Sequence, residues 1–188
     1  MFFSENRKRI EAACGNGRVL DVGSWADPFP RADYVLDLFS YETRSLTYHG
    51  IDRLPDTVLY PEPRPGERFR KETWIVHDIC SSRPFPFPDK FFDFVICSHT
   101  LEDLAYPAVT LEMLPRVAEA GYVSVPSRYL ESLRPEGPYR GFIHHRWVLD
   151  AALDRQSLVL APKIALREHL ALSSEWVWPD APERFEFQ

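Results

Sequence analysis

Cysteine and glycine are both scarce in this 188-residue chain. The three cysteines, Cys14, Cys80 and Cys97, are an odd number and show no CxxC spacing. This pattern argues against a disulfide framework and against a structural zinc site. The chain holds 8 glycines but 17 prolines. Because most of the prolines fall between the apolar segments, we interpret them as rigid connections rather than as disorder.

The sequence also lacks a long apolar run and a basic stripe. No apolar segment approaches the roughly 18 residues of a membrane span, and the first residues do not follow the order of a signal peptide. The formal net charge is −6, and the basic residues are scattered, which disfavours a nucleic acid as partner. We therefore expect a cytoplasmic protein that binds neither nucleic acid nor a membrane.

Alternating apolar and turn-forming segments predict an α/β fold. The expected helices cover residues 5–14 and 106–118, and the expected strands cover 18–23, 34–38, 74–79, 91–97 and 121–125. Such alternation is typical of a mainly parallel, Rossmann-like sheet, here in a single domain over 1–188. From His145 onward the pattern predicts an antiparallel C-terminal hairpin at one edge of this sheet, with its turn at 153–156. A short helix near 164–169 and a strand around 185–187 follow.

Polar residues and a glycine stand where four of these strands end, and ligands bind parallel sheets at the carboxyl ends of the strands. Gly23 lets the backbone turn sharply and approach a ligand. Asp37 is placed to accept two hydrogen bonds from a ribose diol, and Asp78 to accept one from an adenine amino group. Ser98 and His99 follow the fourth strand. An aspartate or a glycine at a strand end is also a common turn residue. A ligand site is favoured because all four strand ends carry such residues, in order, along the same edge of the sheet.

Three segments of the chain are VLDVGS, HDIC and PFPFPDKFFDFVICSHTLEDL. They resemble the class I S-adenosylmethionine-dependent methyltransferases. The last segment is similar to the small-molecule branch, in which a PF-PD-FD turn leads into the fourth strand. DPFPRADYVLDLF, RVAEAGYVSVPS and HHRWVLD resemble a bacterial subgroup of the same family. The resemblance runs from about residue 18 through the final strand. It implies a class I methyltransferase fold, S-adenosylmethionine as the cofactor, and O- or N-methylation of a small-molecule acceptor.

The resemblance also implies a role for each matching residue. The first loop would line the methionine end of the cofactor, the acid after the second strand would hold the ribose, and the residues after the third strand would frame the adenine. Ser98 would face the methyl-transfer side together with His99. The cofactor-binding residues would thus be Asp21, Gly23, Ser24, Trp25, Asp37, Asp78, Ile79 and Ser98.

The first loop departs from the family pattern. The family has a D/E-x-G-x-G-x-G loop, whereas Gly23 stands alone here and Trp25 occupies the second glycine position. The span from Asp21 to Asp37 is short, so we expect a reduced or missing first crossover helix. Trp25 can stack on the cofactor, or it can fill the cofactor's space. The alternative to an enzyme is therefore a catalytically inactive pseudo-methyltransferase that acts as a binding or scaffold protein.

Three histidines are candidate catalytic bases. His99 is the first, because it directly follows the fourth strand, and His144 and His145 are the second. Each of them can equally be a hydrogen-bonded structural residue. The three histidines with Glu102 could also ligate a metal. Because adjacent residues of a strand point to opposite faces, we expect no metal at this pair.

The aromatic C-terminal segment leaves the oligomeric state open. Its side chains can pack on their own domain or pair two subunits into a homodimer. They are Trp176, Trp178, Phe185 and Phe187.

Overall fold

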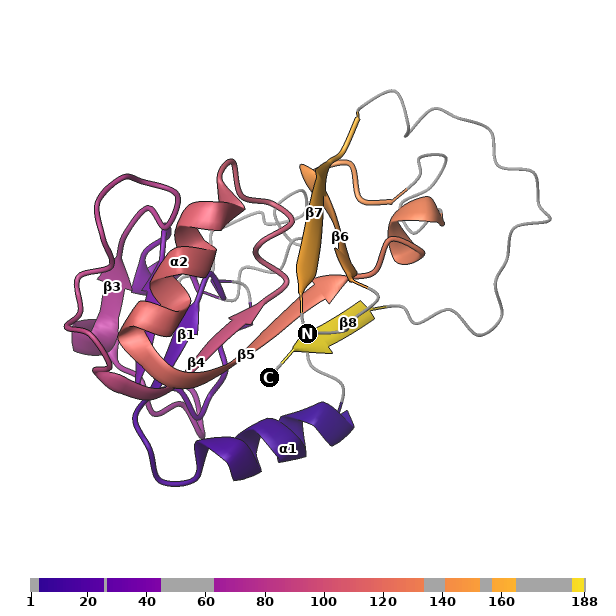
Figure 1. Cartoon of the computed structure of the whole chain (residues 1–188). Helices are drawn as coiled ribbons and strands as arrows, with labels where there is room; N and C mark the ends of the chain where they lie inside the picture. The colour runs from indigo at the N-terminus through magenta and orange to yellow at the C-terminus, as the bar shows by residue number, and fades with distance from the viewer. Residues whose placement is uncertain are drawn as a thin grey trace, which may run out of the picture.

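A six-stranded sheet organises the fold (Figure 1). The computed structural model describes residues 4–25, 27–44, 63–133, 141–152, 157–164 and 184–187. The strands are β1 (Val19–Val22), β2 (Tyr34–Asp37), β3 (Trp74–Val76), β4 (Phe92–Ser98), β5 (Ala118–Pro126) and β8 (Arg184–Phe187). They lie in the order β3-β2-β1-β4-β5-β8, with β1 to β5 parallel and β8 antiparallel to β5. The predicted mainly parallel sheet is thus confirmed.

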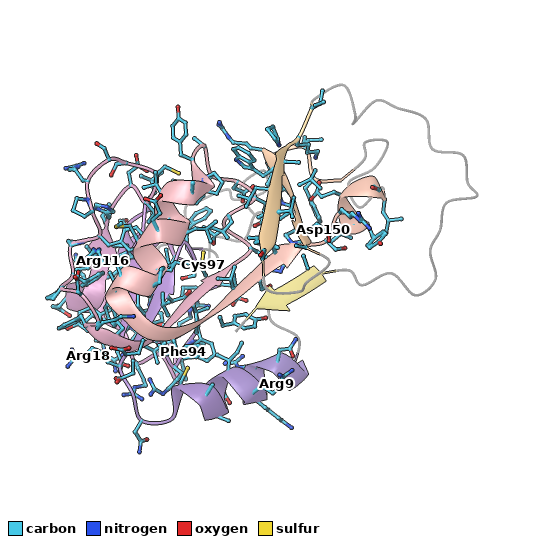
Figure 2. The ribbon with its side chains drawn as sticks, viewed as in Figure 1. Arg9, Arg18, Phe94, Cys97, Arg116 and Asp150 are labelled. Atoms are coloured by element: carbon cyan, nitrogen blue, oxygen red, sulfur yellow. The ribbon has the colours of Figure 1, made fainter. Side chains whose placement is uncertain are left out.

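Both faces of the sheet are buried, because apolar residues occupy consecutive positions of the central strands. In β1, Val19 packs in one core cluster with Ile10 of α1 (Ser4–Cys14), whereas Leu20 packs in the other with Leu114 of α2 (Pro107–Val117). In β4, Phe94 and Cys97, labelled in Figure 2, also belong to different clusters. The two predicted long helices are confirmed, and they cover opposite faces of the sheet.

The C-terminal hairpin forms as predicted but lies elsewhere. Its strands β6 (Trp147–Ala151) and β7 (Leu158–Pro162) make a separate two-stranded antiparallel sheet. An isolated bridge between Ser127 and Leu149 connects it to the end of β5. The prediction that the hairpin extends an edge of the main sheet is wrong, because β8 pairs with β5 over residues 123–126. Figure 1 shows the hairpin beyond the carboxyl end of β5.

The connection from β1 to β2 is short. Residues 23–25 and 27–33 form turns and no helix, so the predicted reduction of the first crossover is confirmed for the part that the structure describes. Two hydrogen bonds anchor the connection: the Asp33 amide donates to the Val19 carbonyl at 2.9 Å, and the Val19 amide donates to the Asp33 carboxylate at 2.9 Å.

Other expectations fall outside the described residues. They concern the turn at 153–156, most of the helix near 164–169, and the tryptophans at 176 and 178. In the described part of the chain, no helix has the length and apolar character needed to cross a membrane.

Candidate functional site

Gly23 ends β1 at a place where only glycine fits. Its φ is +71°, in the left-handed region that favours glycine. A Cβ built on Gly23 would stand 2.2 Å from Cγ2 of Thr100. The Gly23 amide donates to the Leu36 carbonyl at 2.9 Å. The loop after β1 is therefore pressed between the ends of β2 and β4.

The carboxylate of Asp37 lies at the end of β2, where the ribose-binding acid was expected. One oxygen accepts the Trp25 amide and the other accepts the Phe39 amide, each at 2.9 Å. Burial raises the pKa of Asp37, while these amide bonds lower it. The Leu38 amide also lowers this pKa through a hydrogen bond. Because a carboxylate has about four acceptor positions, the three amides leave room for one further donor.

The side chain of Trp25 is held beside this acid. Its ring lies against Phe39 with the ring centroids 4.6 Å apart, and its Nε1 donates to Oγ1 of Thr43 at 3.0 Å. The structure therefore brings Gly23, Trp25 and Asp37 together at the ends of β1 and β2.

Asp21 lies inside the protein, at 1% exposure. Its Oδ2 accepts the Phe29 amide at 2.7 Å. Burial raises the pKa of Asp21 to about 7, although this bond and the nearby Ser24 hydroxyl oppose the shift. Within the present geometry, Asp21 therefore holds the shortened crossover in place.

Of the two residues that were expected to frame the adenine, Asp78 lies at the surface and Ile79 in the core. Asp78 is exposed, and its carboxylate accepts the Cys80 amide at 2.9 Å in a local turn. The Ile79 side chain is buried in the cluster under α2, and its carbonyl accepts the Thr110 hydroxyl at 3.0 Å. Ile79 thus also fastens α2 to the loop after β3.

The end of β4 carries a histidine with an unusual backbone. His99 has φ +53°, and its amide donates to the Ser124 carbonyl at 2.8 Å. Its Nδ1 lies 3.5 Å from Oε1 of Glu102, a side chain at 1% exposure. Among the described residues, Nε2 of His99 and Oγ of Ser98 are buried without a hydrogen-bond partner. Unpaired buried polar atoms are uncommon, and each calls for an explanation such as a bound water, an ion or a catalytic role.

His144 and His145 lie in a second group, at the start of the hairpin. Nε2 of each ring is 3.9 Å from Oδ1 of Asp103. Nδ1 of His145 bonds Oε1 of Glu131, whose other oxygen lies 3.2 Å from Nζ of Lys163. The side chain of Asp103 is 43% exposed, but the groups packed around it partly desolvate its carboxylate. This desolvation raises the pKa of Asp103 to about 7, and His145 opposes the shift. The two histidines precede β6 and are not strand residues, so the reason for expecting them on opposite faces was wrong.

A cavity of about 410 Å³ opens beside this second group. Its position is tied to the end of β4, because the Arg146 amide donates to the Glu102 carbonyl at 2.7 Å. The cavity is lined by Ala105, Ile143, His144, His145, Arg146, Trp147 and Lys163.

Sequence reasoning noted Asp103 after the fourth strand without giving it a role, and it missed three further residues of these two groups: Thr100, Glu131 and Lys163. Thr100 and Asp103 lie in the SHTLEDL segment that carries the resemblance, so their place after β4 was a usable signal. Glu131 and Lys163 stand far apart in the chain and in no recognisable pattern. Only the three-dimensional fold brings them to His145.

Comparisons with known proteins found one family profile and several solved structures that are similar to this chain. The family profile described as "Methyltransferase domain" matches residues 34–124. No curated protein sequence matches the chain. Solved structures match at low identity. An S-adenosylmethionine-dependent methyltransferase from Mesorhizobium loti is 15% identical, with a TM-score of 0.41 over 86% of this chain and 64% of that one. A putative methyltransferase from Bacillus halodurans is 17% identical, with a TM-score of 0.41 over 65% of this chain and 50% of that one.

A third similar structure is the PH0226 protein from Pyrococcus horikoshii. It is 17% identical, with a TM-score of 0.45 over 84% of this chain and 75% of that one. The chain spans 64% and 50% of the length of the first two structures. The family match covers just under half of the chain. Together with the parallel strand order β3-β2-β1-β4-β5, it is consistent with the resemblance to the class I methyltransferases that the sequence shows.

Proposed function

We propose that this protein transfers the methyl group of S-adenosylmethionine to an oxygen or nitrogen of a small molecule. The observation that carries the proposal is the His99–Glu102 pair at the end of β4. His99 turns its Nδ1 toward a buried carboxylate and keeps its Nε2 without a partner among the described residues. A left-handed backbone at a bulky residue costs energy, and such strain is concentrated at functional sites.

The residues at the strand ends fit the cofactor. Ser98 Oγ and His99 Nε2 are buried polar atoms that lack partners in the described part of the chain. Asp37 retains acceptor capacity for a further hydroxyl group. Ser98 and His99 would therefore face the reacting end of the cofactor, and Asp37 its ribose. When bound, S-adenosylmethionine supplies an electrophilic methyl group on a sulfonium.

His99 would act as the general base. In this role, the Glu102 carboxylate, 3.5 Å away, would hold a proton on Nδ1 of His99 and leave the lone pair on Nε2. That nitrogen can accept the proton that an acceptor hydroxyl or amine loses as its bond to the methyl carbon forms. Because the displacement is direct, holding the acceptor in line with the methyl carbon would supply much of the remaining rate.

Trp25 supports a second candidate, the inactive pseudo-methyltransferase. Its ring packs on Phe39, and its amide already occupies one oxygen of Asp37. If these contacts persist in solution, the indole fills the space of the cofactor, and the fold would serve as a binding protein.

Titration of the purified protein with S-adenosylmethionine and S-adenosylhomocysteine separates the two candidates. We expect micromolar binding of both by the wild type. His99→Asn is the informative variant, because asparagine tolerates a left-handed backbone but offers no base. It should bind S-adenosylhomocysteine as the wild type does. With pooled hydroxyl and amino compounds as acceptors, it should form S-adenosylhomocysteine about 10² to 10⁴ times more slowly.

One outcome would contradict methyl transfer by the wild type, and another would contradict the role of His99. Binding by Trp25→Ala but not by a folded wild type would mean that the indole closes the site, and would favour the pseudo-methyltransferase. Equal turnover by His99→Asn and the wild type would remove His99 as the base.

A further inference from the structure

We propose that Asp103, His144 and His145 form a binding site for a divalent cation of the zinc type. Two imidazole nitrogens and one carboxylate oxygen are ligands that zinc commonly takes in proteins. This inference goes beyond methyl transfer and does not depend on it.

The ligand atoms already converge. One such atom from each residue lies within 4.8 Å of the other two, and Nε2 of both histidines is 3.9 Å from the Asp103 carboxylate. Around a tetrahedral zinc, with bonds near 2.1 Å, ligand atoms stand roughly 3.4 Å apart. The side chains of His144 and Asp103 are 27% and 43% exposed, so they can close this difference by rotating without disturbing the core.

The buried surroundings of His145 resemble those of a metal ligand. Its Nδ1 bonds the Glu131 carboxylate, which leaves Nε2 directed at Asp103. A ligating histidine almost always donates its other ring nitrogen to such an acceptor, which fixes the tautomer and the ring orientation. Glu131 is 1% exposed and is itself held by Lys163, so the imidazole is firmly oriented.

Negative charge gathers around the three ligands. Two carboxylates with 1% exposure, those of Glu102 and Glu131, act on the exposed Asp103 carboxylate. Lys163 pairs with Glu131, and Arg146 acts favourably on Asp103. Buried carboxylates are costly unless they are paired or coordinate a metal. A divalent cation between Asp103 and the two histidines would supply the missing positive charge.

The cavity beside the histidines leaves a coordination position open. Both imidazoles line this space of about 410 Å³, as does Arg146. Catalytic zinc sites combine three protein ligands with a fourth position for water or a substrate oxygen. A small anionic molecule could therefore bind the cation and Arg146 together.

A simpler arrangement uses the same groups without a metal. The pKa of His145 is raised despite its burial, because Glu131, Glu102 and Asp103 favour the charged ring. A protonated His145 could then link Glu131 to Asp103 and fasten the hairpin. The two arrangements differ in the role of His144. Metal binding requires His144 as a ligand, whereas the link from Glu131 through His145 to Asp103 forms without it.

Zinc binding to the whole, tag-free protein tests the proposal. The protein is treated with a chelator and dialysed, then titrated with Zn²⁺ in a calorimeter and with Co²⁺ in a spectrophotometer. We expect one equivalent of metal and visible Co²⁺ bands. His144→Ala and Asp103→Asn should each weaken binding at least 10-fold, and Glu131→Gln should weaken it 10- to 100-fold, about the usual effect of losing an orienting partner. The matched control is Asp89→Asn, which removes an acid that is 76% exposed and paired with Arg116.

Either of two results would overturn the proposal. One is a folded wild type that binds no zinc and gives no Co²⁺ bands. The other is zinc affinity in His144→Ala equal to that in Asp89→Asn, because binding would then not use His144.

Discussion

The hydroxyl of Thr100 donates a 2.9 Å hydrogen bond to the carbonyl of Gly23, and thereby joins the loops that follow β1 and β4. These two loops carry the cofactor-binding and the proton-accepting groups of the proposed site. The methyl group of Thr100 also lies where a side chain on Gly23 would extend. The relative position of the two loops therefore depends on this contact.

Gly23→Ala should destabilise the fold by about 2 to 5 kcal/mol. A left-handed backbone costs an alanine roughly 1–2 kcal/mol, and a Cβ only 2.2 Å from Thr100 Cγ2 adds overpacking of about 1–3 kcal/mol. Urea denaturation measures the loss. A Thr100→Ala background removes the two nearest atoms, Cγ2 at 2.2 Å and Oγ1 at 2.8 Å, and leaves the Cβ of residue 100 at 3.1 Å, so most of the overpacking should disappear. An equal cost in both backgrounds would show that the two loops are not in contact.

The sheet could be predicted from the sequence because its evidence is local. Apolar runs such as 91–97 are bounded by turn residues, and each became a strand to within a few residues. The position of the hairpin could not be predicted in this way. Either β8 or the hairpin could pair with the free edge of β5, and in the structure β8 does. Because these segments are far apart in the sequence, no short-range pattern predicts which of them pairs there.

Asp21→Asn should change how stability depends on pH. Burial raises the pKa of Asp21 from 3.8 to about 7 in the folded protein, so the folded state binds this proton more tightly than the unfolded state does. The stability that Asp21 contributes is therefore complete below pH 4, falls as the pH rises toward 7, and is constant above that. The asparagine side chain of the variant still accepts the Phe29 amide, but it has no carboxyl group that titrates.

Denaturation curves from pH 4 to 8 test this prediction. The stability of the variant relative to the wild type should rise by on the order of 1 to 4 kcal/mol between pH 4 and pH 7. A difference that stays constant with pH would mean that Asp21 titrates normally.

The candidate site could be predicted only in part. Gly23, Asp37 and His99 could be named as candidates because a strand end is a local feature and ligand sites in parallel sheets occur there. Glu131 and Lys163 could not be found, because their contacts with the 143–146 segment are made only once the hairpin has folded onto the end of β4. His145 itself was found, but without the partners that decide its chemistry.

Arg44→Met should cost about 3 kcal/mol of stability. The Arg44 side chain is fully buried, its Nη2 lies 3.2 Å from Glu67, and its guanidinium stacks 3.8 Å from the centre of the Tyr41 ring. Removing one partner of a buried ion pair leaves an uncompensated charge, at a cost of roughly 3–5 kcal/mol. The lower value is expected because Arg64 also pairs with Glu67. The control is Arg64→Met. Because Arg64 is 40% exposed, urea denaturation should show that this variant loses no more than about 1 kcal/mol of unfolding free energy.

The three thiols should react at very different rates. Burial raises the pKa of Cys14 to about 11, and burial together with Glu102 and Asp21 also raises the pKa of Cys97. Cys80 is only half-buried. Because the thiolate is the reactive form, a thiol reagent at pH 8 should label one cysteine quickly in the folded protein and all three in denaturant. Cys80→Ser should remove the fast phase; a fast phase that survives this change would mean that a core thiol is accessible.

The slow labelling of Cys97 then reports on the proposed site. Its side chain lies in β4 with 0% exposure, so the reagent reaches it only when the ends of β1 and β4 open. A ligand that binds the closed form alone lowers the open population by the factor 1 + [L]/Kd. S-adenosylhomocysteine at 100 times its Kd should therefore slow the labelling of Cys97 by about 100-fold, and leave that of Cys80 unchanged. If both rates are unaffected at saturating ligand, S-adenosylhomocysteine does not bind across these strand ends.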